Sequence, residues 1–90
     1  MGKTIYLADD DESARELASV FLEHEGFLVT SFPTGDELFA ACEEALPDLV
    51  ILDIMMPGTD GLSICSALRQ NSKTLPIIIT SNIYIPLPFI

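Results

Sequence analysis

Carboxylates that directly follow two apolar segments are the residues of this sequence best suited to chemistry. Asp9, Asp10 and Asp11 come after the apolar segment 4–8, and Asp53 comes after the segment 49–52. If both segments are neighbouring parallel strands, these carboxylates converge at one edge of a sheet. Their mutual repulsion then calls for a hard divalent cation, which carboxylate oxygens bind well. The sequence therefore predicts an acidic Mg²⁺ pocket that includes Asp9, Asp10 and Asp53.

The segment 49–53 is the predicted central strand that positions this pocket. Four consecutive aliphatic residues, without polar alternation, precede Asp53. Such a run is typical of a strand buried on both faces in a parallel α/β sheet. A carboxylate beside so much apolar surface is costly, so Asp53 is expected at the strand's C-terminal end, where a cation can meet it.

Strand and helix patterns alternate along the rest of the chain. Strands are expected at 4–8, 27–32, 49–53 and 77–79, the last ended by Thr80. A first helix is expected over 12–24. A second is expected to begin at a Thr34–Glu37 capping box, to end at Pro47, and to bury Leu38, Ala41, Cys42 and Ala45. A third is expected after Asp60, which can cap it. In the first helix, Ala14, Leu17, Ala18, Phe21 and Leu22 recur at helical spacing, and Gly26 suits a left-handed C-terminus. This order implies right-handed crossovers and a parallel sheet whose ligands bind at the carboxyl ends of the strands.

Composition bounds the class of protein. Ninety residues, 49% of them hydrophobic, suit one small domain with an ample core. A formal net charge of −10, with only four basic residues, argues against direct nucleic acid binding. No apolar run approaches about 18 residues and no signal peptide pattern is present, so a cytoplasmic protein without a membrane span is expected. Cys42 and Cys65 lack metal or redox spacing and are expected to be reduced core residues.

Three motifs stand in order along residues 3–81. They are the Asp9-Asp10 pair, the segment Asp53-x-Met-Met-Pro-Gly-x-Asp60-Gly61, and the segment Leu75-Pro76-Ile-Ile-Ile-Thr80. Together they resemble the receiver domain of response regulators in two-component signalling. The resemblance implies a flavodoxin-like, doubly wound parallel sheet with strand order 2-1-3-4-5.

The resemblance also implies roles for individual residues. Asp53 stands where the family accepts a phosphoryl group from a histidine kinase or a histidine phosphotransfer protein. Mg²⁺ would be held by Asp10, Asp53 and the backbone carbonyl of Met55, with Asp9 acting through water. Thr80 resembles the hydroxyl residue that hydrogen-bonds a phosphoryl oxygen. Such a module phosphorylates only itself, so an enzyme with a separate substrate is not expected.

The C-terminal residues depart from the family pattern. A parallel crossover needs a dozen or more residues, so the segment 82–90 cannot be the next parallel strand. Laid on the family's fifth strand, Tyr84 takes the place of the aromatic switch residue and Leu87 that of the lysine. The last two helices of the receiver fold are missing as well. We therefore expect a partial receiver at 1–81 with strand order 2-1-3-4, and an apolar tail at 82–90 as a non-standard fifth strand.

Loss of the final helix is expected to bare an apolar face of the first and third strands. Two arrangements of the tail remain open. It can exchange with a second copy and form a two-fold homodimer. It can also turn at Ser81-Asn82 and run antiparallel as an edge strand, blunted by Pro86 and Pro88.

Two functions from different classes also remain open. The leading one is a phosphoacceptor module of a phosphorelay, supported by the complete acidic set. The alternative is a truncated or engineered pseudo-receiver that serves as a binding or dimerisation scaffold, favoured by Leu87 and the missing helices. A hydrolytic metalloenzyme lacks a visible general base. The acidic residues 9–12 also fit a plain helix N-terminus, and His24 is expected to be a solvated surface residue.

Overall fold

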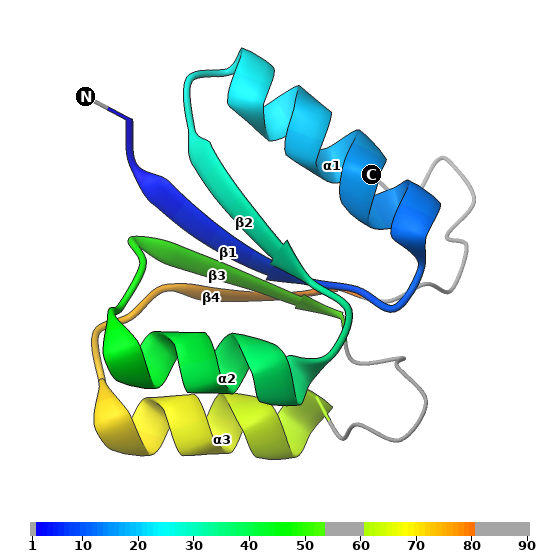
Figure 1. Ribbon diagram of the computed structural model, residues 1–90. Coiled ribbons are helices and arrows are strands. Elements are labelled where there is room, and N and C mark those ends of the chain that lie inside the picture. Colours follow the sequence, from blue (N-terminus) through cyan, green and yellow to red (C-terminus); the bar gives the residue numbers. More distant parts are fainter. Residues whose placement is uncertain (1, 54–60, 81–90) are drawn as a thin grey trace, which may run out of the picture.

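The computed structural model describes residues 2–53 and 61–80, which form a parallel sheet with helices on both faces. The elements are β1 (Thr4–Ala8), α1 (Glu12–His24), β2 (Leu28–Phe32), α2 (Gly35–Glu44), β3 (Leu49–Asp53), α3 (Gly61–Asn71) and β4 (Ile77–Thr80). The strand order is β2-β1-β3-β4, and each neighbouring pair is parallel. Helix α1 covers one face, while α2 and α3 cover the other (Figure 1). The predicted order 2-1-3-4 is therefore confirmed, and the expected fifth strand and Asp60 cap lie outside the described residues.

Helix α1 begins and ends as the sequence predicted. The backbone N–H of Ser13 donates to the Asp11 carboxylate at 3.1 Å, which caps the N-terminus. At the other end Gly26 has a φ of 99°, in the left-handed region that favours glycine. Its N–H donates to the carbonyl of Glu23 at 3.0 Å, and the N–H of Phe27 donates to that of Leu22 at 3.1 Å. These bonds close the helix and turn the chain toward β2.

Helix α2 differs from the expectation in two details. The N–H of Glu37 donates to the Thr34 hydroxyl at 3.1 Å, as predicted. The hydroxyl in turn donates to the Glu37 carboxylate at 3.1 Å, so the second bond joins the two side chains. The expected burial of Ala45 is wrong, because the helix ends at Glu44 and Ala45 is an exposed, extended cap residue.

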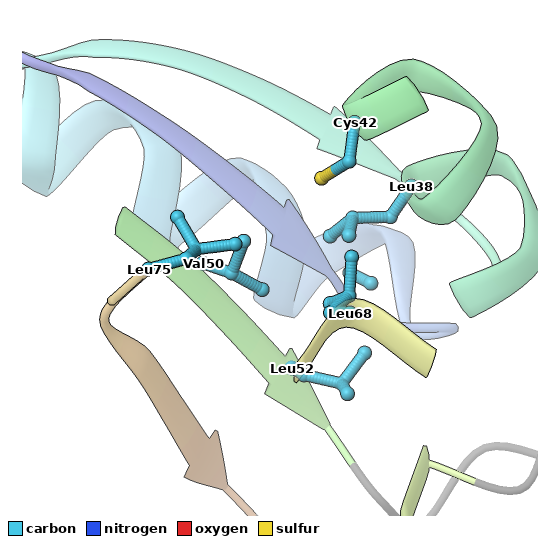
Figure 2. Packing of buried hydrophobic residues seen from close by; sticks show 7 residues of the cluster. Leu38, Cys42, Val50, Leu52, Leu68 and Leu75 are labelled. Atoms are coloured by element: carbon cyan, nitrogen blue, oxygen red, sulfur yellow. The ribbon is translucent and has the colours of Figure 1, made fainter. Parts of the chain in front are cut away.

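The main core lies between the sheet and the pair α2 and α3. Its buried members are Ala8, Leu38, Cys42, Val50, Leu52, Leu68 and Leu75 (Figure 2). Tyr6 and Phe32 pack against this cluster, with their rings edge to face at a centroid distance of 5.4 Å. Each fully buried aliphatic side chain stabilises the fold by about 2 kcal/mol. This packing holds the carboxyl ends of β1 and β3 in register.

Exposed apolar side chains lie elsewhere than expected. On β1, Ile5 and Leu7 are buried. On α1, however, Leu17 is 73% exposed and Phe21 is 63% exposed, and Ile78 of β4 is about half exposed. Leu28 of β2, Leu46 and Leu62 of α3 are exposed as well, so the exposed apolar side chains are spread over several elements. The expected bare apolar face is wrong for β1, because Ile5 and Leu7 are buried there. Among residues 2–53 and 61–80, no helix is long and apolar enough to cross a membrane.

Candidate metal and phosphoacceptor site

The predicted convergence of strand ends is present in the structure. Ala8 of β1 pairs with Leu52 of β3, so Asp9 follows β1 beside Asp53, the last residue of β3. One carboxylate oxygen from each of Asp9, Asp10 and Asp53 lies within 4.8 Å of the other two. Two neighbouring parallel strands therefore deliver three carboxylates to one edge of the sheet.

The three carboxylates differ in burial. Asp53 on the central strand is 0% exposed, Asp9 is half-buried, and Asp10 is exposed. A fully buried carboxylate is costly unless other groups compensate its charge. The donors gathered here are all oxygens, the set that hard cations such as Mg²⁺ prefer. The residues present therefore fit a divalent cation, and Asp10 is the exposed member of the set.

The electrostatics of Asp9 reflect this crowding. Burial raises the pKa of the Asp9 carboxyl, and the negative charges of Asp53, Asp10 and Asp11 raise it further. A hydrogen bond from the N–H of Asp11 to Asp9 Oδ1, at 2.9 Å, opposes this rise. A cation among these groups would favour the ionised form. The acidic cluster is therefore destabilising by itself and suited to a counter-ion.

The acidic residues of the loop between β1 and α1 make different contacts. Asp11 caps α1, so the interpretation as a plain helix N-terminus holds for this residue. Asp9 and Asp10 instead gather with Asp53. The N–H of Asp9 donates to the carbonyl of Phe32 at 3.1 Å, which extends the contact between β1 and β2 by one residue. The loop is thus held to the sheet where the carboxylates begin.

Thr80 lies at the same edge, one strand beyond the acidic cluster. It is the register partner of Asp53 in the β3–β4 pair, and its side chain is exposed. The sequence placed it at a strand end, and the structure brings it beside the predicted acceptor. Met55, Tyr84 and Leu87, to which the sequence assigned roles, lie outside the described residues.

The sequence-based prediction missed Arg15. Its Nη1 donates to the backbone carbonyl of Asp9 at 2.8 Å, in a partly buried contact. The residue lies in the first turn of α1, whose side chains face the preceding loop. In the sequence, the only sign of this contact is that Arg15 stands three residues after the start of a helix that follows the Asp9–Asp10 pair.

The comparisons with known proteins agree with this fold and site. A family model described as the response regulator receiver domain matches residues 5–84. The chain therefore belongs to the response regulator receiver domain family, as its motifs indicated. It is similar to the transcriptional regulatory protein ResD of Bacillus subtilis, with 39% identity over 77 residues, which is 86% of this chain and 32% of ResD.

A second relative is the DNA-binding response regulator MtrA of Mycolicibacterium smegmatis. Its identity is 36% over 81 residues, which is 90% of this chain and 36% of MtrA. The chain spans about a third of the length of these curated relatives.

Solved structures show the same architecture. The response regulator TrrA of Thermotoga maritima, in complex with Mg²⁺-BeF, matches with a TM-score of 0.84 and 35% identity over 88% of this chain and 69% of that one. A complex of the histidine kinase ThkA with TrrA matches with a TM-score of 0.85 and 34% identity, covering 92% and 72% of the two chains. The chemotaxis protein CheY4 of Vibrio cholerae reaches 0.86 at 28% identity, with 96% and 73% covered. The predicted flavodoxin-like receiver fold is confirmed.

Proposed function

We propose that this chain is the phosphoacceptor module of a two-component phosphorelay and takes a phosphoryl group on Asp53 in the presence of Mg²⁺. The observation that carries this proposal is the gathering of Asp9, Asp10 and buried Asp53 within 4.8 Å at the carboxyl edge of the sheet. The proposed donor is a histidine kinase or a histidine phosphotransfer protein. Support comes from the similar receiver TrrA, which was solved with Mg²⁺-BeF and with a histidine kinase.

Each residue has a proposed role in the transfer. A carboxylate oxygen of Asp53 forms a bond to phosphorus as the bond from phosphorus to the donor's imidazole nitrogen breaks, with the electron pair passing to that nitrogen. Bound Mg²⁺ offsets charge on the phosphoryl oxygens. Asp10 and Asp53, with the Met55 carbonyl, are its proposed ligands, and Asp9 acts through water. The Thr80 hydroxyl donates to a phosphoryl oxygen. The module modifies itself and turns over no separate substrate.

A scaffold without productive phosphotransfer is the second candidate. The exposed apolar residues Leu17, Val20 and Phe21 of α1 favour association with another protein surface. Leu87, in the place of the family's lysine, favours it as well. Homodimerisation through the tail 82–90, and a boundary between receiver and tail at residue 81, belong to this candidate and stay predictions. Light scattering during gel filtration tests the dimer, since a monomer at micromolar concentration contradicts it.

Location and nucleic acid binding stay predictions too. We expect a cytoplasmic module that does not itself contact DNA, because the chain carries a net charge of −10. The names of ResD and MtrA describe a transcriptional regulator and a DNA-binding regulator, of which this chain spans about a third.

Intact-mass spectrometry tests the phosphoacceptor proposal directly. The purified chain is incubated with acetyl phosphate and Mg²⁺, beside the variant Asp53→Asn and a sample with the metal chelated. The parent should gain one phosphoryl group only with Mg²⁺, and Asp53→Asn should gain none. Absence of labelling in a parent that binds Mg²⁺ would favour the scaffold, and labelling of Asp53→Asn would refute the acceptor assignment.

A further inference from the structure

The guanidinium of Arg15 ties helix α1 to the acidic edge of the sheet. Its Nη1 donates to the carbonyl oxygen of Asp9 at 2.8 Å, while its own backbone N–H donates to the carbonyl of Asp11 at 2.9 Å. Arg15 is one of only four basic residues in a chain with 14 acidic ones. Arg15 is thus a positively charged residue that contacts the backbone of Asp9, one of the residues of the predicted metal site.

The bond from Arg15 is a third contact that holds Asp9 in place. The N–H of Asp9 is held by the carbonyl of Phe32 at 3.1 Å, and Asp9 Oδ1 accepts the N–H of Asp11 at 2.9 Å. The carbonyl of Asp9 and the nitrogen of Asp10 share one rigid peptide plane. Holding that carbonyl oxygen therefore fixes the direction in which the chain leaves Asp9 and the point from which the Asp10 side chain starts.

We propose that Arg15 is a positioning residue for the Mg²⁺ site, which holds the Asp9–Asp10 peptide so that the Asp10 carboxylate meets those of Asp9 and Asp53. This inference rests on the proposed function, because it names a residue that orients the ligands of the same metal site. Outer partners that orient metal ligands commonly change metal affinity by about 10- to 100-fold when they are replaced.

The two effects of Arg15 on a cation have opposite signs. Its positive charge repels Mg²⁺, so removal of the charge alone should tighten binding. Its hydrogen bond preorganises the ligands, so removal of the bond should weaken binding. The sign of the change in affinity therefore separates a positioning role from a simple charge effect.

Isothermal titration calorimetry with Mg²⁺ on the full chain measures this sign. Arg15→Met removes both charge and donor at similar length, and Arg15→Lys keeps a charged donor. The matched control is Arg69→Met, which loses the same charge. Arg69 donates to the carbonyls of Ser72 and Leu75 beyond the C-terminus of α3, away from the carboxyl edge of the sheet. Arg15→Met should raise the dissociation constant for Mg²⁺ about tenfold, Arg15→Lys should recover part of the affinity, and Arg69→Met should leave it unchanged.

A second readout excludes a merely structural role. The rate of labelling by acetyl phosphate is followed against Mg²⁺ concentration, with the free energy of unfolding measured without Mg²⁺. Arg15→Met should raise the half-saturating Mg²⁺ concentration while the rate at saturation stays that of the parent. A lowered free energy of unfolding with unchanged Mg²⁺ affinity overturns the inference, as does tighter binding by Arg15→Met.

Failure of the inference and failure of the proposed function give different results. A parent that binds Mg²⁺ and is labelled, with Arg15→Met identical to it, refutes the role of Arg15 alone. A parent that binds no Mg²⁺ refutes the metal site and this role together.

Discussion

Asp53 and Thr80 are register partners at the carboxyl ends of β3 and β4. Partners in neighbouring parallel strands point to the same side of a sheet and lie about 4.8 Å apart between strand axes. Asp53 is fully buried, whereas Thr80 is exposed. The pair therefore places a shielded carboxylate, the proposed acceptor, beside an exposed threonine.

Replacement of Thr80 tests whether this hydroxyl takes part in the transfer. A hydrogen bond to a charged phosphoryl oxygen contributes about 1.5–3 kcal/mol, so Thr80→Ala should slow labelling by acetyl phosphate roughly 10- to 100-fold. Thr80→Ser keeps the hydroxyl and should stay within a few-fold of the parent. Because the side chain is exposed, both variants should retain the free energy of unfolding to within about 0.5 kcal/mol. Equal labelling rates for Thr80→Ala and Thr80→Ser would remove Thr80 from the site.

Neutralising Asp10 should change stability in opposite directions with and without metal. Three carboxylates lie within 4.8 Å, so their repulsion destabilises the metal-free fold. Asp10→Asn should raise the free energy of unfolding without Mg²⁺ by on the order of 1 kcal/mol. It should also abolish most of the stabilisation that saturating Mg²⁺ gives the parent. Urea denaturation in chelator and in Mg²⁺ measures both effects, and a variant less stable than the parent in chelator would contradict the repulsion.

The fold and the gathering of Asp9, Asp10 and Asp53 were predictable because local chemistry marks them. The unbroken aliphatic run before Asp53 is typical of a buried strand. Thr34 marks a helix start through its side-chain hydroxyl, and Gly26 marks a helix end through its left-handed backbone. The contact of Arg15 with Asp9 was not predictable in this way, since it depends on where a long side chain meets a loop in space. Helical spacing likewise grouped Leu17 with Phe21 on one face, but spacing does not say what covers that face.

Gly26 should tolerate no L side chain without cost. Its φ of 99° lies where a Cβ is strained, although a Cβ there would meet no atom within 4 Å. Gly26→Ala should therefore lower the free energy of unfolding by about 1–2 kcal/mol through backbone strain alone. Gly26→Asn should cost less, because asparagine enters the left-handed region more readily. Urea denaturation of the two variants decides this, and equal costs would point to a contact rather than to the backbone.

Cys42 and Cys65 should differ in reactivity toward a thiol reagent. Cys42 is 6% exposed in the core, and burial raises the pKa of its thiol to about 11, whereas Cys65 is only half-buried. Since the thiolate is the reactive form, roughly one Cys42 thiol in a thousand is ionised at pH 8. Iodoacetamide should modify Cys65 first and reach Cys42 only on unfolding, as peptide mass mapping would show. Faster modification of Cys42 in the folded chain would contradict the described core.

Asp48 lies at the end of the sheet away from the acidic cluster. It should make the free energy of unfolding depend on pH in the acid range. The N–H of Thr4 donates to Asp48 Oδ2 at 2.8 Å and the Thr4 hydroxyl donates to the same oxygen at 3.2 Å, and these bonds hold the pKa of Asp48 below its usual value.

A lowered pKa in the folded chain means that the unfolded chain binds the proton more readily. The stabilisation from Asp48 is therefore complete above the unfolded pKa of about 4 and is lost as the pH falls through the folded pKa. Asp48→Asn cannot titrate, so the difference in free energy of unfolding between parent and variant should be constant above about pH 5 and shrink toward pH 3. Urea denaturation across this range measures it. A difference that is the same at both ends of the range would show that the bonds with Thr4 do not depend on the charge of Asp48.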